Sequence, residues 1–307
     1  MAELALGFLA GILAGAQKLT HLAHLRGDVM RPALLAIQRI GSQSGFTRFF
    51  QGFTSPGKNL APFRPLWRWG LERLPSRAGG DALDLDSTRL LHEDGPQEGV
   101  KVGDPRLGPK PCRHPLLAVL EEAKWGGGFW LRPGDAGCAN NVVAFTLDLL
   151  ANLPRGIRRR LVRADSGYLY QGLVTNLPTS VPPLEVWRQY HPRAGCEEVI
   201  KQLDADFALP KLCLQKFWGT EAALSLAILS YNLTQLFQRH LGWLDRVTAN
   251  TLRFRLFPTG GILSQTGGMT TIRLAVREPQ ERAWWRALLE KTISLIPNCN
   301  AVAQSSG

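Results

Sequence analysis

The chain has 307 residues, 45% hydrophobic and 20% charged, so it is long enough for one large or two ordinary domains, and global disorder is excluded. Its net charge of +11 predicts a polyanionic partner, either nucleic acid or an acidic membrane surface. The five cysteines lie far apart and form no CxxC pair, which argues against a structural zinc site or a disulfide framework and favours a reducing cytoplasm.

Residues 1–80 are predicted to be helical, because apolar residues recur at helical spacing between Gly, Ser and Pro turns. They hold ten Lys or Arg and three Asp or Glu, a net charge of +7. Residues 33–40, 41–45 and 46–53 follow the order helix, short turn, helix. This is the layout of a helix-turn-helix module, whose second helix, here with Arg48, enters a major groove. An ordinary helical hairpin has the same layout, so both interpretations stay open.

Two apolar segments, residues 4–16 and 222–237, are the candidate membrane spans of this sequence. The first is shorter than the roughly 20 residues that a span needs, and Glu3 stands where a signal peptide needs basic residues. The second contains Asn232, Thr234 and other polar residues. We therefore expect both segments to be buried helices, and no membrane partner.

From about residue 81 the pattern becomes that of an α/β protein. Residues 82–88, ALDLDST, alternate leucine with aspartate and predict a strand with one apolar and one acidic face. Further strands are predicted over residues 97–105, 126–135 and 159–167, with a helix over 140–152. Strands followed by a helix and another strand imply a mixed α/β sheet.

The second half is predicted to be mostly helical. Behind Pro192, an apolar stripe of Cys196, Ile200 and Leu203 indicates a helix. Residues 220–240 are apolar nearly all round and predict a long buried helix. The end of the chain is predicted to form a β-hairpin and a helix, with strands over 250–258 and 269–277 and an amphipathic helix over 281–296.

Three acidic residues occupy positions suited to metal chemistry. Asp86 and Asp165 lie within or at the ends of predicted strands, and Glu197 lies in the first turns of a predicted helix. Carboxylates at adjacent strand ends, with a third from a packed helix, are able to hold two divalent ions for phosphodiester chemistry. We expect the two aspartates to face one cleft, because consecutive sheet elements tend to be neighbours. Asp84 shares the face of Asp86 and is the reserve candidate.

Each acid also has a structural interpretation. The aspartates of residues 82–88 would form the solvated face of an edge strand, and Asp165 would be a turn residue before glycine. Glu197 would pair with Arg193 and Lys201 on one helix face. For each residue alone both interpretations stay open, and the catalytic one depends on their joint occurrence in a basic chain.

The segments ALDLDST, RADSGY and YHPRAGCEEVIK resemble the three signatures of DDE-type insertion-sequence transposases, in particular the insertion-sequence-1380-like group. Similar segments from HLAHLRGD to TIRLAV extend the resemblance over most of the chain. It implies a ribonuclease-H-like mixed sheet with helices, preceded by a helical N-terminal DNA-binding region. By position, it makes Asp86, Asp165 and Glu197 the triad that binds Mg²⁺ or Mn²⁺. It also makes Tyr190 and Arg193 of the YxxRxxxE signature DNA contacts near the reactive phosphate.

The sequence departs from this family in two places. Seven residues after the glutamate the family has a lysine, whereas this chain has Asp204, and Lys201 is the nearest base for DNA. Only 31 residues separate Asp165 from Glu197, where the family has a much longer segment, so we expect an internal deletion. Residues 168–171 are too few for a parallel crossover. Either the following LVTNL segment pairs antiparallel after a tight turn, or the core is incomplete.

The resemblance implies three regions: a DNA-binding region over 1–80, a shortened catalytic core over 81–246, and a hairpin and helix over 247–307. The implied function is metal-dependent cleavage at the ends of an insertion sequence and strand transfer into target DNA. Its partners are double-stranded DNA, as element ends and target, and a second copy in a homodimer on paired ends, at the nucleoid of the bacterial cytoplasm. An inactive remnant that only binds DNA is the alternative. A basic amphipathic protein on an anionic membrane ranks last.

Overall fold

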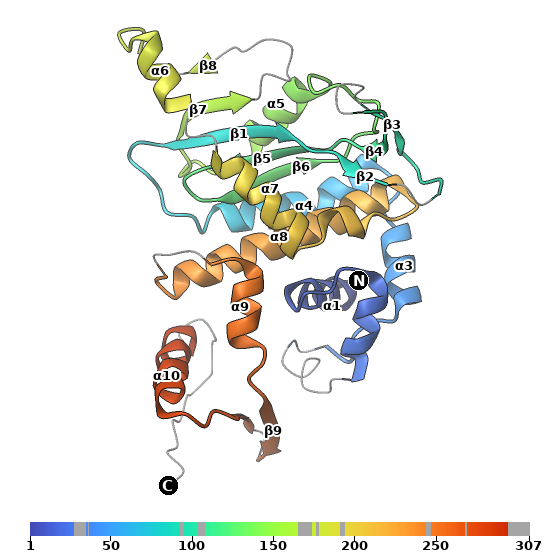
Figure 1. Ribbon diagram of the computed structural model, residues 1–307, viewed down its shortest axis with the longest axis vertical. Coiled ribbons are helices and arrows are strands. Elements are labelled where there is room, and N and C mark those ends of the chain that lie inside the picture. The colour runs from blue at the N-terminus through green and yellow to red at the C-terminus, as the bar shows by residue number, and fades with distance from the viewer. Residues whose placement is uncertain are drawn as a thin grey trace. The chain divides into compact units, whose positions relative to one another are not determined.

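The computed structural model describes residues 1–27, 35, 37–92, 95–103, 108–164, 174–175, 178–190, 194–243, 247–267 and 269–293. The chain divides into two compact units, Met1–Asn232 and Leu233–Gly307, whose elements are labelled in Figure 1. The helices that begin in the first unit are α1 (Ala2–Leu13), η1 (Leu19–Gly27), α3 (Gln43–Gln51), α4 (Pro56–Leu71), α5 (Val142–Asn152), α6 (Pro183–Tyr190), α7 (Ala194–Asp206), η3 (Leu209–Leu212) and α8 (Phe217–His240). Within the described ranges, none of the helices is both long and apolar enough to cross a bilayer.

The first unit is built on a five-stranded sheet with the order β6-β5-β1-β7-β8 (Figure 1). Its strands are β1 (Asp81–Ser87), β5 (Leu116–Leu120), β6 (Trp125–Trp130), β7 (Arg159–Ala164) and β8 (Val174–Thr175). β1 runs antiparallel to β5 and parallel to β7, which confirms the predicted mixed α/β sheet. β8, which holds Val174 and Thr175 of the LVTNL segment, runs antiparallel to β7, and this is the pairing that the first of the two alternatives expects.

β1 is a central strand, and both of its faces are buried. Leu83 and Leu85 lie on one face, and Asp84 and Asp86 lie on the other, because side chains alternate along a strand. Asp84 is 0% exposed and Asp86 is half-buried. The interpretation of the acidic face as a solvated edge is therefore wrong. The sequence pattern is that of an edge strand, but the acidic face is covered by helices.

Glycines in β6 let helices approach both faces of the sheet. A Cβ atom on Gly128 would lie 3.2 Å from Leu149 of α5, and one on Gly126 would lie 2.6 Å from Ile228 of α8. In the ladder, Gly128 is in register with the leucine face of β1 and Gly126 with its aspartate face. The helices α5 and α8 therefore cover opposite faces, and α8 lies on the side of the aspartates.

A side-chain amide caps the edge strand β6. Asn232 of α8 accepts a hydrogen bond from the backbone N of Gly126 (3.0 Å) and donates one to its carbonyl oxygen (2.8 Å). These two bonds satisfy the backbone groups of Gly126 as a neighbouring strand would. Asn232 stands in the predicted buried helix over residues 220–240, and α8 confirms that helix.

The N-terminal helices share an aromatic core, in which Phe8 of α1 packs on Phe46 and Phe50 of α3. The expected helix-turn-helix differs from the structure in its boundaries. Residues 37–40 lie outside any helix, and α3 begins at Gln43, inside the segment predicted as the turn. The physical reason is the N-cap Ser42, whose Oγ accepts a hydrogen bond from the backbone N of Gly45 at 3.1 Å. The rest of the expected first helix lies largely outside the described residues.

Three strands were not predicted from the sequence: β5, β2 (Leu90–Leu91) and β4 (Pro111–Arg113). With β3 (Lys101–Val102), which lies in the predicted strand over 97–105, β2 and β4 form a small sheet of order β2-β4-β3. The strand β5 is a short apolar run buried on both faces. Because residues on both faces of this strand are apolar, its sequence lacks the alternation of apolar and polar residues by which strands are recognised.

The second unit contains α9 (Ala249–Leu256), the hairpin strands β9 (Gly261–Thr266) and β10 (Met269–Leu274), and α10 (Pro279–Ile293). The predicted hairpin exists, but its first strand was wrong, because most of residues 250–258 forms α9. Thr248 caps this helix by accepting a hydrogen bond from the backbone N of Thr251 at 3.3 Å. The strand β9 instead occupies the segment that was expected to be the connection, and Gly267 supplies the positive φ of +60° at the turn.

Candidate functional site

The candidate site is the C-terminal end of β1, where Asp86 meets the first turn of α7. The backbone N of Ser87 donates a hydrogen bond to Oδ1 of Asp86 at 2.7 Å. The thiol of Cys196 lies 4.0 Å from Oδ2 of the same carboxylate, the outer limit of a weak S–H hydrogen bond. A residue of α7 therefore touches the side chain of a residue 110 positions earlier.

This contact brings together two of the three signature segments. Glu197 follows Cys196 directly, and its side chain is exposed. The parallel pairing of β1 with β7 ends at Leu85 and Ala164, the residues that directly precede Asp86 and Asp165. Asp165 itself lies outside the described residues.

Of the residues predicted to contact DNA, the structure describes the side chains of Lys201 and Arg48 but not those of Tyr190 and Arg193. Tyr190 is the last residue of α6, but its side chain is outside the description, as is the whole of Arg193. Lys201 is exposed on α7, one turn after Glu197. Arg48 is exposed on α3.

Asp84, the reserve candidate for a metal ligand, forms a buried ion pair with Arg163. The guanidinium of Arg163 on β7 donates from Nε to Oδ1 and from Nη2 to Oδ2, the second bond at 2.6 Å. The two side chains are 0% and 2% exposed. Burial lowers the pKa of Arg163, but the hydrogen bond and charge of Asp84, with the charges of Glu121 and Glu122, outweigh this and raise it. Both oxygens of Asp84 are thus bound by a fixed cation, which makes it a poor metal ligand.

A second charged pair supports the start of α7. Lys124 donates to Oε1 of Glu121 at 2.5 Å across the turn between β5 and β6. Gly195, the buried residue before Cys196, lies against this pair, because a Cβ atom there would contact both charged groups. The first turn of α7 is therefore positioned by the β5–β6 turn as well as by its contact with Asp86.

The loop after β6 lies beside the site, in contact with Ser87. Arg132, 1% exposed, donates from Nε to the carbonyl of His114 (2.8 Å) and from Nη1 to the carbonyls of Gly137 (2.9 Å) and Asn140 (2.6 Å). The loop carries Cys138, whose Sγ is 3.6 Å from the hydroxyl of Ser87. A buried arginine thus fixes a loop beside the residue that follows Asp86.

The residues that build this site are not predicted by the sequence pattern. Arg132 and Arg163 bind carbonyls and a carboxylate from other strands, and no local pattern signals such a role. Cys196 was assigned to an apolar stripe, and its burial confirms that assignment. Its second role, the contact with Asp86, depends on a tertiary approach that spacing along one helix does not encode.

Asp204, at the position where the family has a lysine, is an acid in an apolar setting. Burial raises its pKa to about 6, and its Oδ1 is buried with no hydrogen-bond partner among the described residues. The neutral form of this carboxyl is favoured in the folded protein. Its contribution to stability is therefore complete at pH values below the ordinary pKa of 3.8 and is lost as the pH rises through about 6. At pH 8 the Asp204→Asn variant should therefore have a free energy of unfolding about 1–2 kcal/mol above that of the parent, after allowance for solvent screening, and should unfold at a higher temperature.

The measurement is thermal unfolding of both proteins at pH 5 and pH 8. The Glu198→Gln variant, an exposed carboxyl on the same helix, serves as the control and should track the parent at both pH values. A gain for Asp204→Asn of equal size at pH 5 and pH 8 would contradict an ionised buried carboxylate as its source.

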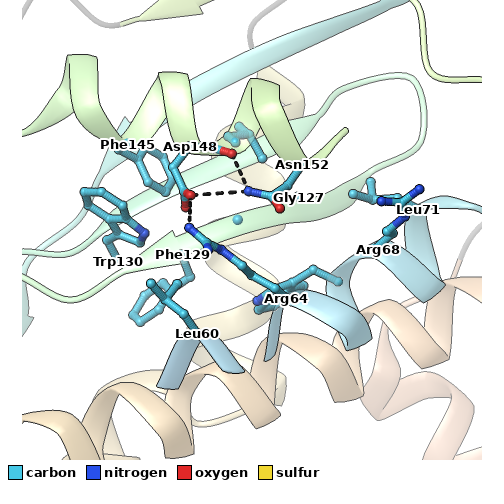
Figure 2. Close-up of a pocket in the computed structure, with 13 residues that line it drawn as sticks. Leu60, Arg64, Arg68, Leu71, Gly127, Phe129, Trp130, Phe145, Asp148 and Asn152 are labelled. Atoms are coloured by element: carbon cyan, nitrogen blue, oxygen red, sulfur yellow. Dashed lines mark hydrogen bonds and ion pairs between the residues drawn. The ribbon is translucent and has the colours of Figure 1, made fainter. Parts of the chain in front are cut away.

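A pocket on the other face of the sheet is lined by α4, α5 and β6 (Figure 2). Arg64 of α4 forms an ion pair with Asp148 of α5, and Asn152 donates to the same carboxylate at 3.3 Å. Leu149, which lines this pocket, packs on the leucine side of β1. The pocket is thus separated from Asp86 by the sheet and is not part of the candidate site.

Residues 170–294 match the family model described as transposase DDE domain, group 1. The match covers less than half of the chain and includes Glu197, while Asp86 and Asp165 precede it. It supports a DDE transposase. No curated protein and no solved structure matches the chain.

DDE transposases typically use a divalent metal ion, and the donor chemistry of the site fits one. The carboxylates of Asp86 and Glu197 are hard oxygen donors of the kind that Mg²⁺ and Mn²⁺ prefer. Across the described residues, no group of three His, Cys, Asp or Glu side chains is close enough to hold a metal. The third carboxylate expected from the sequence, Asp165, lies outside that description.

Proposed function

We propose that the protein is a DNA transposase of the DDE type that cleaves the ends of an insertion sequence and transfers the strand into target DNA. The observation that carries this proposal is the contact between Cys196 and Asp86, which joins the α7 segment inside the family match to a β1 segment outside it. It supports a catalytic centre formed by Asp86, Asp165 and Glu197 in a ribonuclease-H-like core.

In this mechanism the chain supplies the ligands and their positions. Ser87 orients the Asp86 carboxylate through its backbone N–H, and Cys196 limits its rotation from the α7 side. Glu197 offers an exposed carboxylate from the same turn of α7. Bound Mg²⁺ or Mn²⁺ would supply charge stabilisation of the phosphodiester and activation of the attacking water or 3′-hydroxyl.

DNA binding is proposed for the basic surface of the chain. Residues 1–80 carry a net charge of +7, and Arg48 and Arg26 line a groove between η1 and α3 together with Ser44 and Thr47. Arginine and hydroxyl side chains of this kind contact phosphates. Lys201, Tyr190 and Arg193 are proposed to contact the DNA near the reactive phosphate, on a homodimer that pairs two ends at the bacterial nucleoid.

The test compares Glu197→Gln with Glu198→Gln, two exposed neighbours on α7 that differ in their proposed role. Each protein is incubated with Mg²⁺ or Mn²⁺ and a duplex that carries the DNA flanking its own gene, and strand cleavage is followed on a denaturing gel. We expect Glu197→Gln to lose cleavage by about 10²-fold or more, since a metal ligand contributes several kcal/mol. Glu198→Gln should cleave like the parent.

Equal cleavage by all three proteins would remove Glu197 from the mechanism. Salt-sensitive duplex binding without cleavage by the parent protein, in either metal, would instead indicate a remnant that only binds DNA.

A further inference from the structure

The second unit exposes phenylalanine side chains on a short, firmly held helix. Phe254 of α9 is 80% exposed, and Phe257 at the end of that helix is 53% exposed. They are three residues apart and so lie on the same side of the helix. Two exposed aromatic side chains on one side of a helix are a candidate contact surface for another molecule.

The helix that carries them is anchored, so the rings are held on a fixed support. Ala249 and Leu252 are buried on the opposite side of α9. The side-chain amide of Gln238 donates to the carbonyl of Val247 at 3.1 Å and accepts from its backbone N at 2.9 Å. Two hydrogen bonds therefore fix the chain directly before the Thr248 cap.

The segment that carries the rings is cationic. Arg253 and Arg255 flank Phe254 in the sequence, and Arg253 donates a hydrogen bond from Nη1 to Oδ1 of Asn250 at 2.8 Å. Residues 247–277 contain four arginines and no aspartate or glutamate. A second copy of this surface would be repelled by the like charge, whereas a polyanion with flat apolar groups would match both its charge and its aromatic rings.

We propose that α9 binds single-stranded DNA, with Phe254 and Phe257 stacking on unpaired bases and Arg255 contacting the phosphates. Bases present a flat π-face only when they leave the duplex, and aromatic rings interleaved with basic residues are the usual means of binding them. The inference rests on the proposed function in taking DNA as the polyanion, and it does not require cleavage. It gives the protein a site for the unpaired strand that a cut or melted end would present.

The test measures binding of the full chain to a fluorescent 20-nucleotide oligothymidine in a buffer with EDTA, by fluorescence anisotropy. We expect Phe254→Ala to weaken binding by about 5- to 100-fold, the effect of losing one stacked base, and Phe254→Trp to restore it. Ile262→Ala, which removes a 71% exposed apolar side chain without a ring from the same unit, is the matched control and should bind like the parent.

Two further ligands identify what the ring recognises. An abasic 20-mer keeps the phosphates but lacks the bases, so the parent should bind it more weakly than oligothymidine, and Phe254→Ala should bind it as the parent does. A 20-base-pair duplex should be bound equally by both proteins. Arg255→Gln should reduce the salt dependence of oligothymidine binding by about 0.7 in the logarithmic slope.

The inference is overturned if Phe254→Ala binds oligothymidine as tightly as the parent, or if it loses duplex and abasic binding to the same extent. It is also overturned if the variant loses binding only to vesicles containing phosphatidylserine, which would identify a membrane surface instead. Because no metal is present, failure here is separate from failure of the cleavage assay, and each proposal stands or falls on its own measurement.

Discussion

Replacing Asp84 by alanine is expected to lower the free energy of unfolding by about 3–5 kcal/mol, the usual effect of breaking a buried ion pair by removing one of its partners. Asp84 and Arg163 are 0% and 2% exposed, and the guanidinium binds both carboxylate oxygens. The variant would keep the positive charge in the core of the sheet without this partner. Thermal unfolding should show a fall of about 6–20 °C.

A double variant separates the charge from the space that the pair fills. Asp84→Leu combined with Arg163→Met replaces the pair with apolar side chains, and such replacements are often neutral or stabilising. We expect it to recover most of the loss. If the double variant is as unstable as Asp84→Ala, the cause of the loss is packing and not the buried guanidinium without its Asp84 partner.

Asp84 and Asp86 are indistinguishable in the sequence, where both alternate with leucine in one strand. Alternation correctly places them on one face of β1, but it does not reveal their different roles. The difference arises from the parallel register with β7, which puts Arg163 opposite Asp84. Register depends on contacts between strands some 79 residues apart, and a single sequence carries no direct sign of them.

Elements whose structure is determined by local pattern were predicted well, because a single sequence shows local pattern but not long-range contacts. The strands β1 and β7 and the helices α5, α8 and α10 have strong local patterns, and the structure confirms them to within a few residues. The alternation of arginine and phenylalanine in residues 252–257 suggested a strand. It forms the helix α9 because the Thr248 cap and the burial of Leu252 decide the local structure. Sequence alone does not show that Phe254 is exposed, so this aromatic residue was counted as a buried position of a strand.

The approach of α7 to β1 was the least predictable part of the site. The sequence gives a short connection between Asp165 and Glu197, from which an incomplete core was an open alternative. The antiparallel strand β8 uses part of that connection, and Cys196 still reaches Asp86. A connection of only 31 residues is therefore compatible with a helix that packs against the end of β1.

The largest effect on activity is expected from Asp86→Asn. Asparagine has the size of aspartate and keeps an oxygen that accepts the hydrogen bond from the Ser87 backbone N, so the local structure should be retained. It lacks the negative charge that a divalent ion requires. We expect metal-dependent cleavage of the end-containing duplex to fall by about 10³-fold or more, with duplex binding within about twofold of the parent.

Asp135→Asn is the matched control, because it removes one negative charge from a half-exposed site where the carboxylate lies 3.6 Å from Lys101. It changes the net charge of the protein by the same amount, so it should reproduce any general effect of charge on DNA binding and leave cleavage intact. Thermal unfolding of Asp86→Asn should stay within about 2 °C of the parent, unlike that of Asp84→Ala. Cleavage by Asp86→Asn at the rate of Asp135→Asn would exclude Asp86 as a metal ligand. Loss of cleavage together with a large fall in unfolding temperature would mean that Asp86, like Asp84, stabilises the sheet, and the metal centre would then have to be sought elsewhere.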